Sequence, residues 1–236
     1  MIMKRILITM LGLLPTLLNA NTKFGNEINA YSYSMEYKSS DIPLVITSPK
    51  VASEESVIFF ISGDGGWNSF DQKLSEEYAK HGYHVIGLNA LKFFWQKKTP
   101  QQAANSIAQV LNEYLRLFKK DKIILSGYSF GADVLPFIYN RLPANLKNQV
   151  VKLKLLSPAS FTDFEIHVSD LLGSKNSLRS MQVASELQKI TIPTICFYGL
   201  EEEIKPLATY KATNFSIYIV PGDHHYEQNL LNIVRR

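Results

Sequence analysis

A serine between two glycines is the residue of this sequence whose surroundings best suit covalent chemistry. An apolar run, Ile123–Leu125, leads into Ser126-Gly127-Tyr128-Ser129-Phe130-Gly131, and small, helix-compatible residues follow. Gly-x-Ser-x-Gly between a strand and a helix is a nucleophile elbow, in which the chain turns sharply at the serine. The N–H groups at the start of the next helix stabilise negative charge that develops there. The pattern predicts that Ser129 is the nucleophile of an acyl-transfer reaction.

A nucleophilic serine needs a base that takes its proton and an acid that orients the base. Both follow Ser129 in the chain order serine, carboxylate, histidine that one class of hydrolases uses. The glutamates 201–203 come directly after an apolar, strand-like run, and two adjacent histidines follow the last such run. Loop position favours Glu202 as the acid, with its two neighbours as alternatives. His224 is preferred over His225 because it comes first after the turn.

An oxyanion intermediate also needs N–H donors. The sequence predicts one from the backbone of Phe130 and a second from the glycine-rich loop 63–66, supplied by Asp64 or Gly65. Glycines allow a close backbone approach in such a loop. The alternative is that these glycines only allow the backbone to turn and have no role in catalysis.

Three further side chains are predicted to contact the substrate: Trp67, Tyr128 and Asp133. The tryptophan suits an apolar pocket, although dense aromatics also fill cores. The carboxylate of Asp133 lies one turn into the elbow helix. It suits the first turn of a helix, where a negative charge is favourable.

Apolar runs alternate with amphipathic stretches along the chain, which indicates parallel strands covered by helices on both faces. We therefore predict an α/β-hydrolase fold without a large lid domain, with at most a small flap near residues 161–173. One or two edge strands are expected within residues 21–50. The other expected strands are 56–62, 83–88, the elbow strand from 123, 150–156, 191–198 and 215–220, and the expected helices are 71–80, one from Pro100 to about Lys119, the elbow helix and a C-terminal helix.

Composition narrows the function classes. The 236 residues are 46% hydrophobic and carry a formal net charge of +4, which suits one domain with a substantial core. Lysines and arginines form no stripe interleaved with aromatic residues, so nucleic acid is not an expected partner. The single cysteine, Cys196, lies in an apolar run and builds neither a disulfide nor a zinc cluster. No metal and no organic cofactor is implied.

The N-terminus resembles an export signal. Two basic residues, Lys4 and Arg5, precede the apolar run 6–18, and Asn19-Ala20 follows. This layout is typical of a secretory signal peptide. We predict a signal peptide over residues 1–20, cleavage after Ala20, and a single periplasmic domain over residues 21–236, with an uncleaved anchor as the alternative.

Several motifs together resemble one bacterial family, that of the virulence proteins VirJ and AcvB. Each motif is modest by itself, but their order spans nearly the whole chain from Ser56 onward. They are residues 61–67, 93–95, 98–100, 127–137, 140–143, 164–168 and 221–225.

The resemblance implies a periplasmic α/β-hydrolase linked to virulence and type IV secretion, with activity on the aminoacyl ester of lysyl-phosphatidylglycerol. It implies Ser129 as nucleophile, His224 as base and an acid within 200–203. The expected partners are an aminoacylated phospholipid at the membrane surface and components of type IV secretion. One departure is that residues 204–213 lack a cysteine expected there, which leaves Cys196 unpaired. The competing hypothesis is a hydrolase-fold scaffold or binding protein of the secretion machinery that does not depend on catalysis.

Overall fold

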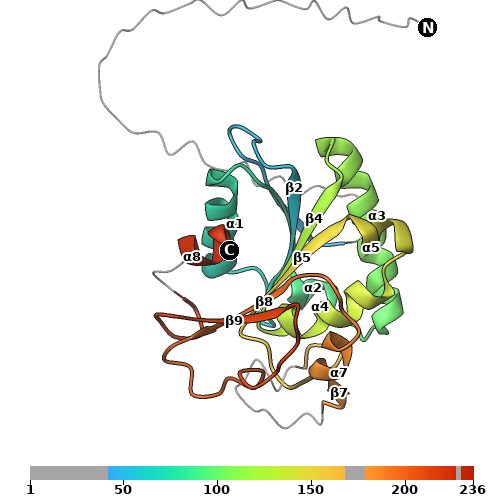
Figure 1. Ribbon diagram of the computed structural model, residues 1–236. Helices are drawn as coiled ribbons and strands as arrows, with labels where there is room; N and C mark the ends of the chain where they lie inside the picture. The colour runs from blue at the N-terminus through green and yellow to red at the C-terminus, as the bar shows by residue number, and fades with distance from the viewer. Residues whose placement is uncertain (1–41, 168–178, 227–229) are drawn as a thin grey trace, which may run out of the picture. The chain divides into compact units, whose positions relative to one another are not determined.

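The computed structural model describes residues 42–167, 179–226 and 230–236 (Figure 1). The predicted signal peptide, most of the expected N-terminal edge strands and part of the expected flap lie outside these residues. Among the described residues, no helix combines the length and the apolar character that a membrane crossing needs.

A seven-stranded sheet forms the centre of the domain, with the strand order β1-β3-β2-β4-β5-β8-β9. Only β1 is antiparallel to its neighbour, and the other pairings are parallel. The strands are β1 (Leu44–Thr47), β2 (Ser56–Ile61), β3 (His84–Leu88), β4 (Lys122–Tyr128), β5 (Val150–Leu156), β8 (Thr194–Gly199) and β9 (Phe215–Val220). The six strands predicted from Ser56 onward are therefore confirmed, with bounds that differ by at most three residues.

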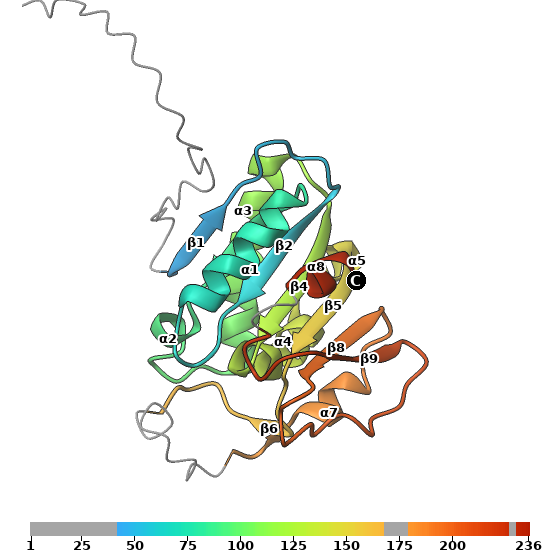
Figure 2. The same cartoon turned by 90° about the vertical axis from the view of Figure 1, so that its left-hand side faces the viewer.

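Helices cover both faces of this sheet (Figures 1 and 2). On one face lie α1 (Ser69–Lys80) and α8 (Leu230–Arg235), which pack against each other. On the other lie α3 (Pro100–Phe118), α4 (Phe130–Arg141) and α5 (Ala144–Gln149). The short helices α2 (Ala90–Phe93) and α7 (Val183–Leu187) contribute to the same core as α3 and α4. The predicted fold class is confirmed.

Two short strands lie in the described parts of the chain at and after the segment where a small flap was expected. These strands, β6 (Phe161–Thr162) and β7 (Met181–Gln182), pair antiparallel apart from the main sheet.

The two long helices that precede the elbow begin at capping boxes. The Thr99 hydroxyl accepts the N–H of Gln102, whose side chain in turn accepts the Thr99 N–H, and Pro100 starts α3 as predicted. Asn68 and Asp71 make the same exchange at α1. This asparagine cap is why α1 begins at Ser69, two residues before the predicted start.

Strand β2 shows why the apolar runs are continuous. Val57, Phe59 and Ile61 belong to the core under α3 and α4, whereas Ile58 and Phe60 belong to the core under α1 and α8. All five are 0% exposed. A strand buried on both faces has no solvent-facing side for polar residues. Each strand of a parallel sheet with helices on both faces is therefore a continuous apolar segment of the sequence.

A buried lysine ties the last helix to the sheet. Lys154, on β5, is 1% exposed, and its Nζ donates to the carbonyl oxygens of Ile233 and Val234, both at 2.9 Å. Burial, with a smaller contribution from the charge of Lys152, lowers the pKa of Lys154 from 10.5 to about 7. The folded state therefore binds this proton less tightly than the unfolded state does.

The lowered pKa of Lys154 should make the free energy of unfolding depend on pH. Between pH 7 and 10 the unfolded chain binds more protons at Lys154 than the folded chain, so the free energy of unfolding should rise with pH. In Lys154→Met this rise should be smaller, because the depressed group is gone. Urea denaturation of the full chain at several pH values measures both slopes. Equal slopes in the two proteins would contradict the assignment.

Candidate active site

The nucleophile elbow lies where the sequence predicts it, at the carboxyl end of β4. Ser129 has φ 51° and ψ −118°, and its N–H donates to the carbonyl of Leu156 at 2.8 Å. A Cβ added at Gly127 would lie 2.4 Å from the Gly131 oxygen, and one added at Gly131 would lie 2.2 Å from the Ile61 oxygen. Backbone atoms would have to move in both cases, so the elbow requires glycine on each side of the serine.

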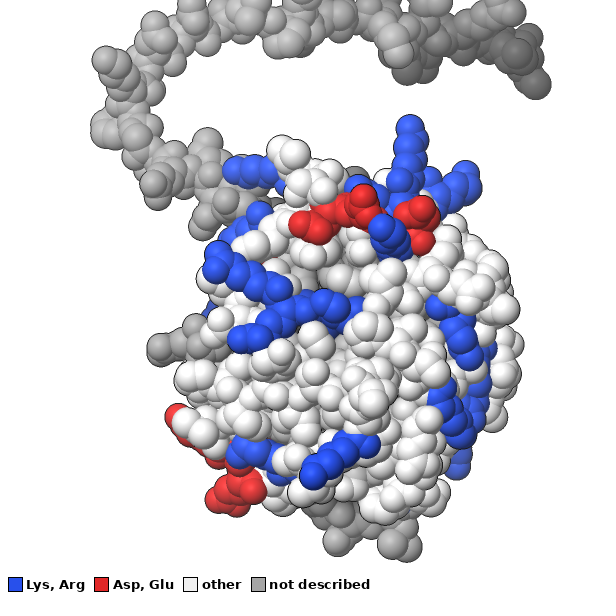
Figure 3. Space-filling model, in the orientation of Figure 1, with Lys and Arg blue, Asp and Glu red and all other residues white. Residues whose placement is uncertain are grey.

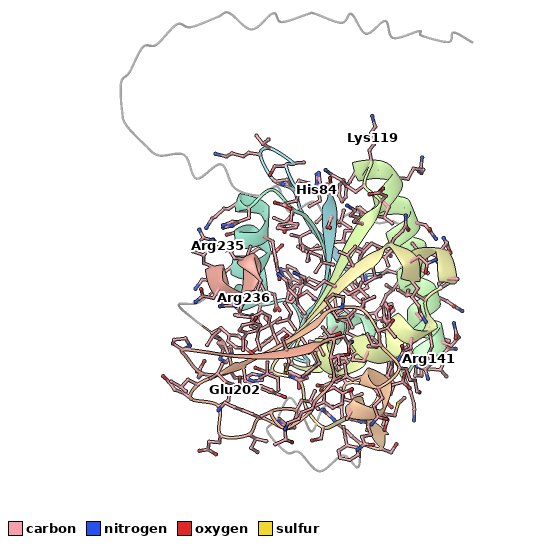
Figure 4. All side chains as sticks on the ribbon, viewed as in Figure 1. His84, Lys119, Arg141, Glu202, Arg235 and Arg236 are labelled. Atoms are coloured by element: carbon pink, nitrogen blue, oxygen red, sulfur yellow. The ribbon has the colours of Figure 1, made fainter. Side chains whose placement is uncertain are left out.

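Of the three predicted acids, the structure brings Glu202 to a histidine. Glu202 lies in the loop that joins β8 to β9 (Figure 4). Its Oε2 lies 3.0 Å from Nδ1 of His224, which follows β9. The Glu202 side chain is 9% exposed and the His224 side chain 41%. Glu201 and Glu203 are exposed. His225 Nδ1 lies 3.7 Å from Asp223 and does not share the Glu202 contact.

The environment of Glu202 favours its ionised form. Burial raises the pKa of this carboxyl, but hydrogen bonds from His224, from the Ser157 hydroxyl and from the Gly199 N–H outweigh burial and hold the pKa below 4.5. The Gly199 N–H reaches Oε1 at 2.5 Å and the Ser157 hydroxyl reaches the same oxygen at 2.6 Å. A carboxylate held in this way can carry negative charge opposite an imidazolium.

A cavity of about 690 Å³ joins these groups, because Ser129, Glu202 and His224 all line it. Six carboxylate residues line it. Among the described lining residues, Arg179 is the one that is a lysine or arginine. The carboxylate residues are Asp64, Asp133, Glu201, Glu202, Glu203 and Asp223. The described residues contain no group of three or more His, Cys, Asp and Glu arranged to hold a metal ion.

Asp133 lies in the first turn of α4 and also in the cavity wall. It is 2% exposed, and its Oδ1 accepts the Ala159 N–H at 2.6 Å. Burial raises the pKa of Asp133 to about 8, against the lowering effects of the Ala159 N–H and of Arg179. A cation that entered the cavity would favour the ionised form.

The predicted oxyanion donors are placed unequally. Phe130, the first residue of α4, and Asp64 both line the cavity beside Ser129. Gly65 is exposed and is not among the lining residues. Of the two predicted donors in the glycine loop, the structure therefore brings only Asp64 to the cavity.

Two of the predicted substrate contacts lie elsewhere. The Trp67 Nε1 donates to Gln72 Oε1 at 3.0 Å, and its ring lies so close to Gly87 that an added Cβ would be 2.2 Å from it. This ring packs on the sheet, where it fills the space left by a glycine. Tyr128 is 4% exposed, and its ring centroid lies 5.2 Å from that of His224, so it packs against the base instead of lining the cavity.

Two site residues carry no motif in the sequence. Ser157 and Tyr226 both have φ 52°, and their hydroxyl groups contact each other next to Glu202. Ser157 directly follows β5 and so reaches the same carboxyl edge as the predicted residues. That position after an apolar run is the only signal in the sequence that could have indicated it.

Solved structures with the same fold extend over most of the chain. Est1E from Butyrivibrio proteoclasticus is 16% identical, with 86% of this chain and 95% of that one covered at a TM-score of 0.59. A proline iminopeptidase from Mycobacterium smegmatis is 13% identical, with 83% and 94% covered and a TM-score of 0.60. A lipase-esterase related protein from Clostridium acetobutylicum is 14% identical, with 81% and 97% covered and a TM-score of 0.57.

These likenesses establish the α/β-hydrolase fold. None of the curated proteins compared with the chain matches its sequence. The family model of the bacterial virulence protein VirJ matches residues 55–236, which contain the elbow, the acid loop and both histidines. The chain therefore belongs to the VirJ family of bacterial virulence proteins.

Proposed function

We propose that this protein is a serine hydrolase that cleaves a carboxylic ester with Ser129, His224 and Glu202. The observation that carries the proposal is the 3.0 Å contact between Glu202 and His224 in the cavity that Ser129 also lines. The backbone of Ser129, at φ 51°, adds support, because strained residues of this kind gather at functional sites. Esterases among the proteins of the same fold are consistent with it.

The residues suit a two-step acyl transfer. Ser129 Oγ attacks the ester carbonyl carbon while His224 Nε2 takes the hydroxyl proton. The Glu202 carboxylate keeps the other imidazole proton on Nδ1 and stabilises the imidazolium. N–H groups of Phe130 and Asp64 stabilise the oxyanion. The imidazolium gives its proton to the departing alkoxide, and a water activated by the same histidine then releases the acid and restores Ser129.

For the substrate we propose the aminoacyl ester of lysyl-phosphatidylglycerol. A lysyl group carries amines that are cationic at neutral pH, and six carboxylate residues line the cavity of a chain whose formal net charge is +4. Lysines and arginines are spread over the face shown in Figure 3, where acidic side chains gather in two places. A cavity in which carboxylates outnumber basic groups concentrates cationic ligands.

The setting proposed for this reaction is the periplasm, at the membrane surface where such a lipid is exposed. It depends on the charged and apolar pattern of residues 1–20. Components of type IV secretion are the proposed protein partners, as the family resemblance implies.

The test of the substrate class is a comparison of two esters. The full-length protein is given lysyl-phosphatidylglycerol in mixed micelles, with free lysine as the readout, and separately a neutral short-chain p-nitrophenyl ester. We expect higher kcat/KM on the lysyl lipid. Cleavage of the neutral ester alone would overturn the substrate while leaving a serine esterase. Cleavage of neither would favour the scaffold hypothesis.

Asp133→Asn tests the cation contact directly. Asparagine keeps an oxygen for the Ala159 N–H but carries no charge. A hydrogen bond to a charged group is worth about 1.5–3 kcal/mol, so kcat/KM on the lysyl lipid should fall by roughly tenfold or more. The neutral ester should change by less than about threefold, since it has no cation to lose. Equal losses on both esters would mean that Asp133 only supports the fold.

A further inference from the structure

Two hydroxyl groups form a chain that ends on the proposed catalytic carboxylate. The Ser157 hydroxyl donates to Glu202 Oε1 at 2.6 Å. The Tyr226 hydroxyl makes a hydrogen bond with the Ser157 hydroxyl and also donates to the carbonyl of Phe197 at 3.0 Å. Ser157 is 6% exposed and Tyr226 is 0% exposed, so water does not replace these contacts.

The number of available hydrogens fixes the direction of these hydrogen bonds. The three contacts share only the two hydrogens of Ser157 and Tyr226, because an ionised Glu202 has none to donate. The Ser157 hydrogen must therefore point at Glu202. Ser157 Oγ then accepts from Tyr226, whose hydrogen is shared with the Phe197 carbonyl. The Ser157 hydroxyl therefore points at the carboxylate, and the hydrogen bond that it accepts from Tyr226 makes it a stronger donor.

The backbone supports a dedicated role for both residues. Among the described residues, the non-glycine positions with positive φ are Lys119, Ser129, Ser157 and Tyr226. Lys119 is the C-cap of α3, a position where this conformation is common. The other three all belong to the site. Each costs roughly 1–2 kcal/mol of backbone strain that glycine would avoid. A side chain held at that cost indicates that its hydroxyl is needed.

We propose that Ser157, supported by Tyr226, is a positioning residue that fixes the Glu202 carboxylate with one oxygen turned toward His224. The proposal rests on the function proposed above for Ser129, His224 and Glu202. Donors from Ser157 and from the Gly199 N–H both hold Oε1, so the carboxylate cannot rotate without breaking two hydrogen bonds. Oε2 is thereby left to face His224 Nδ1.

The groups around Glu202 allow a clear pH test. The titratable groups that face it are Tyr128 from β4, Cys196 from β8, and His224 and Tyr226 from the segment after β9. The Lys205 ammonium donates to the backbone carbonyl of Glu202. Burial raises the pKa of both tyrosines and of the cysteine, so these three stay neutral at physiological pH. The pH test therefore bears on the carboxyl of Glu202, which His224 contacts.

Ser157→Gly is the decisive variant. Glycine accepts φ 52° without strain, so the variant removes the hydroxyl and not the backbone conformation. Losing a donor makes the Glu202 carboxylate more basic, so the pKa of this carboxyl should rise. We expect kcat on the neutral ester to fall by about 10–100-fold, with KM nearly unchanged. The acid limb of the pH profile should move to higher pH.

Two further variants complete the set. Tyr226→Phe removes only the phenol oxygen and should shift the acid limb in the same direction by less, because it acts through Ser157. Ser75→Ala is the matched control, since it removes a buried serine whose hydroxyl donates to Thr47 at 2.7 Å away from the cavity. It should lower stability and leave the acid limb in place.

A second readout does not depend on turnover. The side-chain carboxyl ¹³C resonance of Glu202 in the full-length protein reports the pH at which this group takes up its proton. We expect this midpoint to move to higher pH in Ser157→Gly. An unchanged midpoint and an unchanged acid limb would overturn the positioning role. If wild type cleaves no ester, the proposed function fails, and the NMR midpoint still decides whether Ser157 governs the carboxyl.

Discussion

Ser129→Ala should reduce kcat/KM on any cleaved ester by about 10⁴-fold or more, because the nucleophile is removed while the cavity remains. Alanine has no hydroxyl to form the acyl intermediate. The Ser129 N–H to Leu156 hydrogen bond involves only the backbone, so the elbow should keep its shape. Thermal unfolding and circular dichroism of the variant check that the fold is intact.

Ser75→Ala again provides the control, since that serine lies on α1 and not in the cavity. His224→Ala and the double variant Ser129→Ala/His224→Ala extend the test. Residues that act as one unit give losses that do not add, so the double variant should be about as inactive as either single one. A folded Ser129→Ala protein that keeps a tenth of the wild-type turnover would contradict a nucleophilic role.

Glu202→Gln should lower kcat by about 10⁴-fold, the loss expected when the acid of such a triad becomes an amide. Glutamine can still place an oxygen where Oε1 accepts from Ser157 and Gly199. Its NH₂ then faces His224 Nδ1 in place of Oε2. His224 Nδ1 must then accept a hydrogen bond from this NH₂, so the imidazole proton moves to Nε2. In that tautomer Nε2 can no longer take a proton from Ser129.

The neighbouring glutamates are the matched controls. Glu201→Gln and Glu203→Gln make the same chemical change in exposed side chains of the same loop. On a neutral ester we expect each to change kcat by less than about tenfold. A larger loss in either variant than in Glu202→Gln would show that the acid has been assigned to the wrong residue.

Much of the fold could be predicted because its causes are local. The strand β2 is apolar at five consecutive positions, and α3 begins with a Thr-Pro-x-Gln cap, so both elements carry their own signals. The short helices α2, α5 and α7 have four to six residues, too few for a recognisable period, and the sequence did not predict them. Cys196, which the sequence places in an apolar run, packs in the core and is 0% exposed.

The site was less accessible from the sequence. Ser129, the acid loop and the histidines follow strand ends, so topology brings them to one edge. Ser157 and Tyr226 contact each other across 69 positions of sequence, and no pattern of residue types predicts such a pair. Trp67 had two interpretations, an apolar pocket or the core. Its ring lies in the space left by the missing side chain of Gly87, which favours packing on the sheet.

The central claim is that Ser129 is activated by His224, and covalent labelling tests it most directly. Full-length wild type, Ser129→Ala and His224→Ala are treated with a fluorophosphonate probe, and intact mass is measured over time. We expect one adduct on wild type, none on Ser129→Ala, and labelling slowed by at least about 10²-fold in His224→Ala. Labelling that persists in folded Ser129→Ala, or a folded wild type that does not react, would contradict this claim.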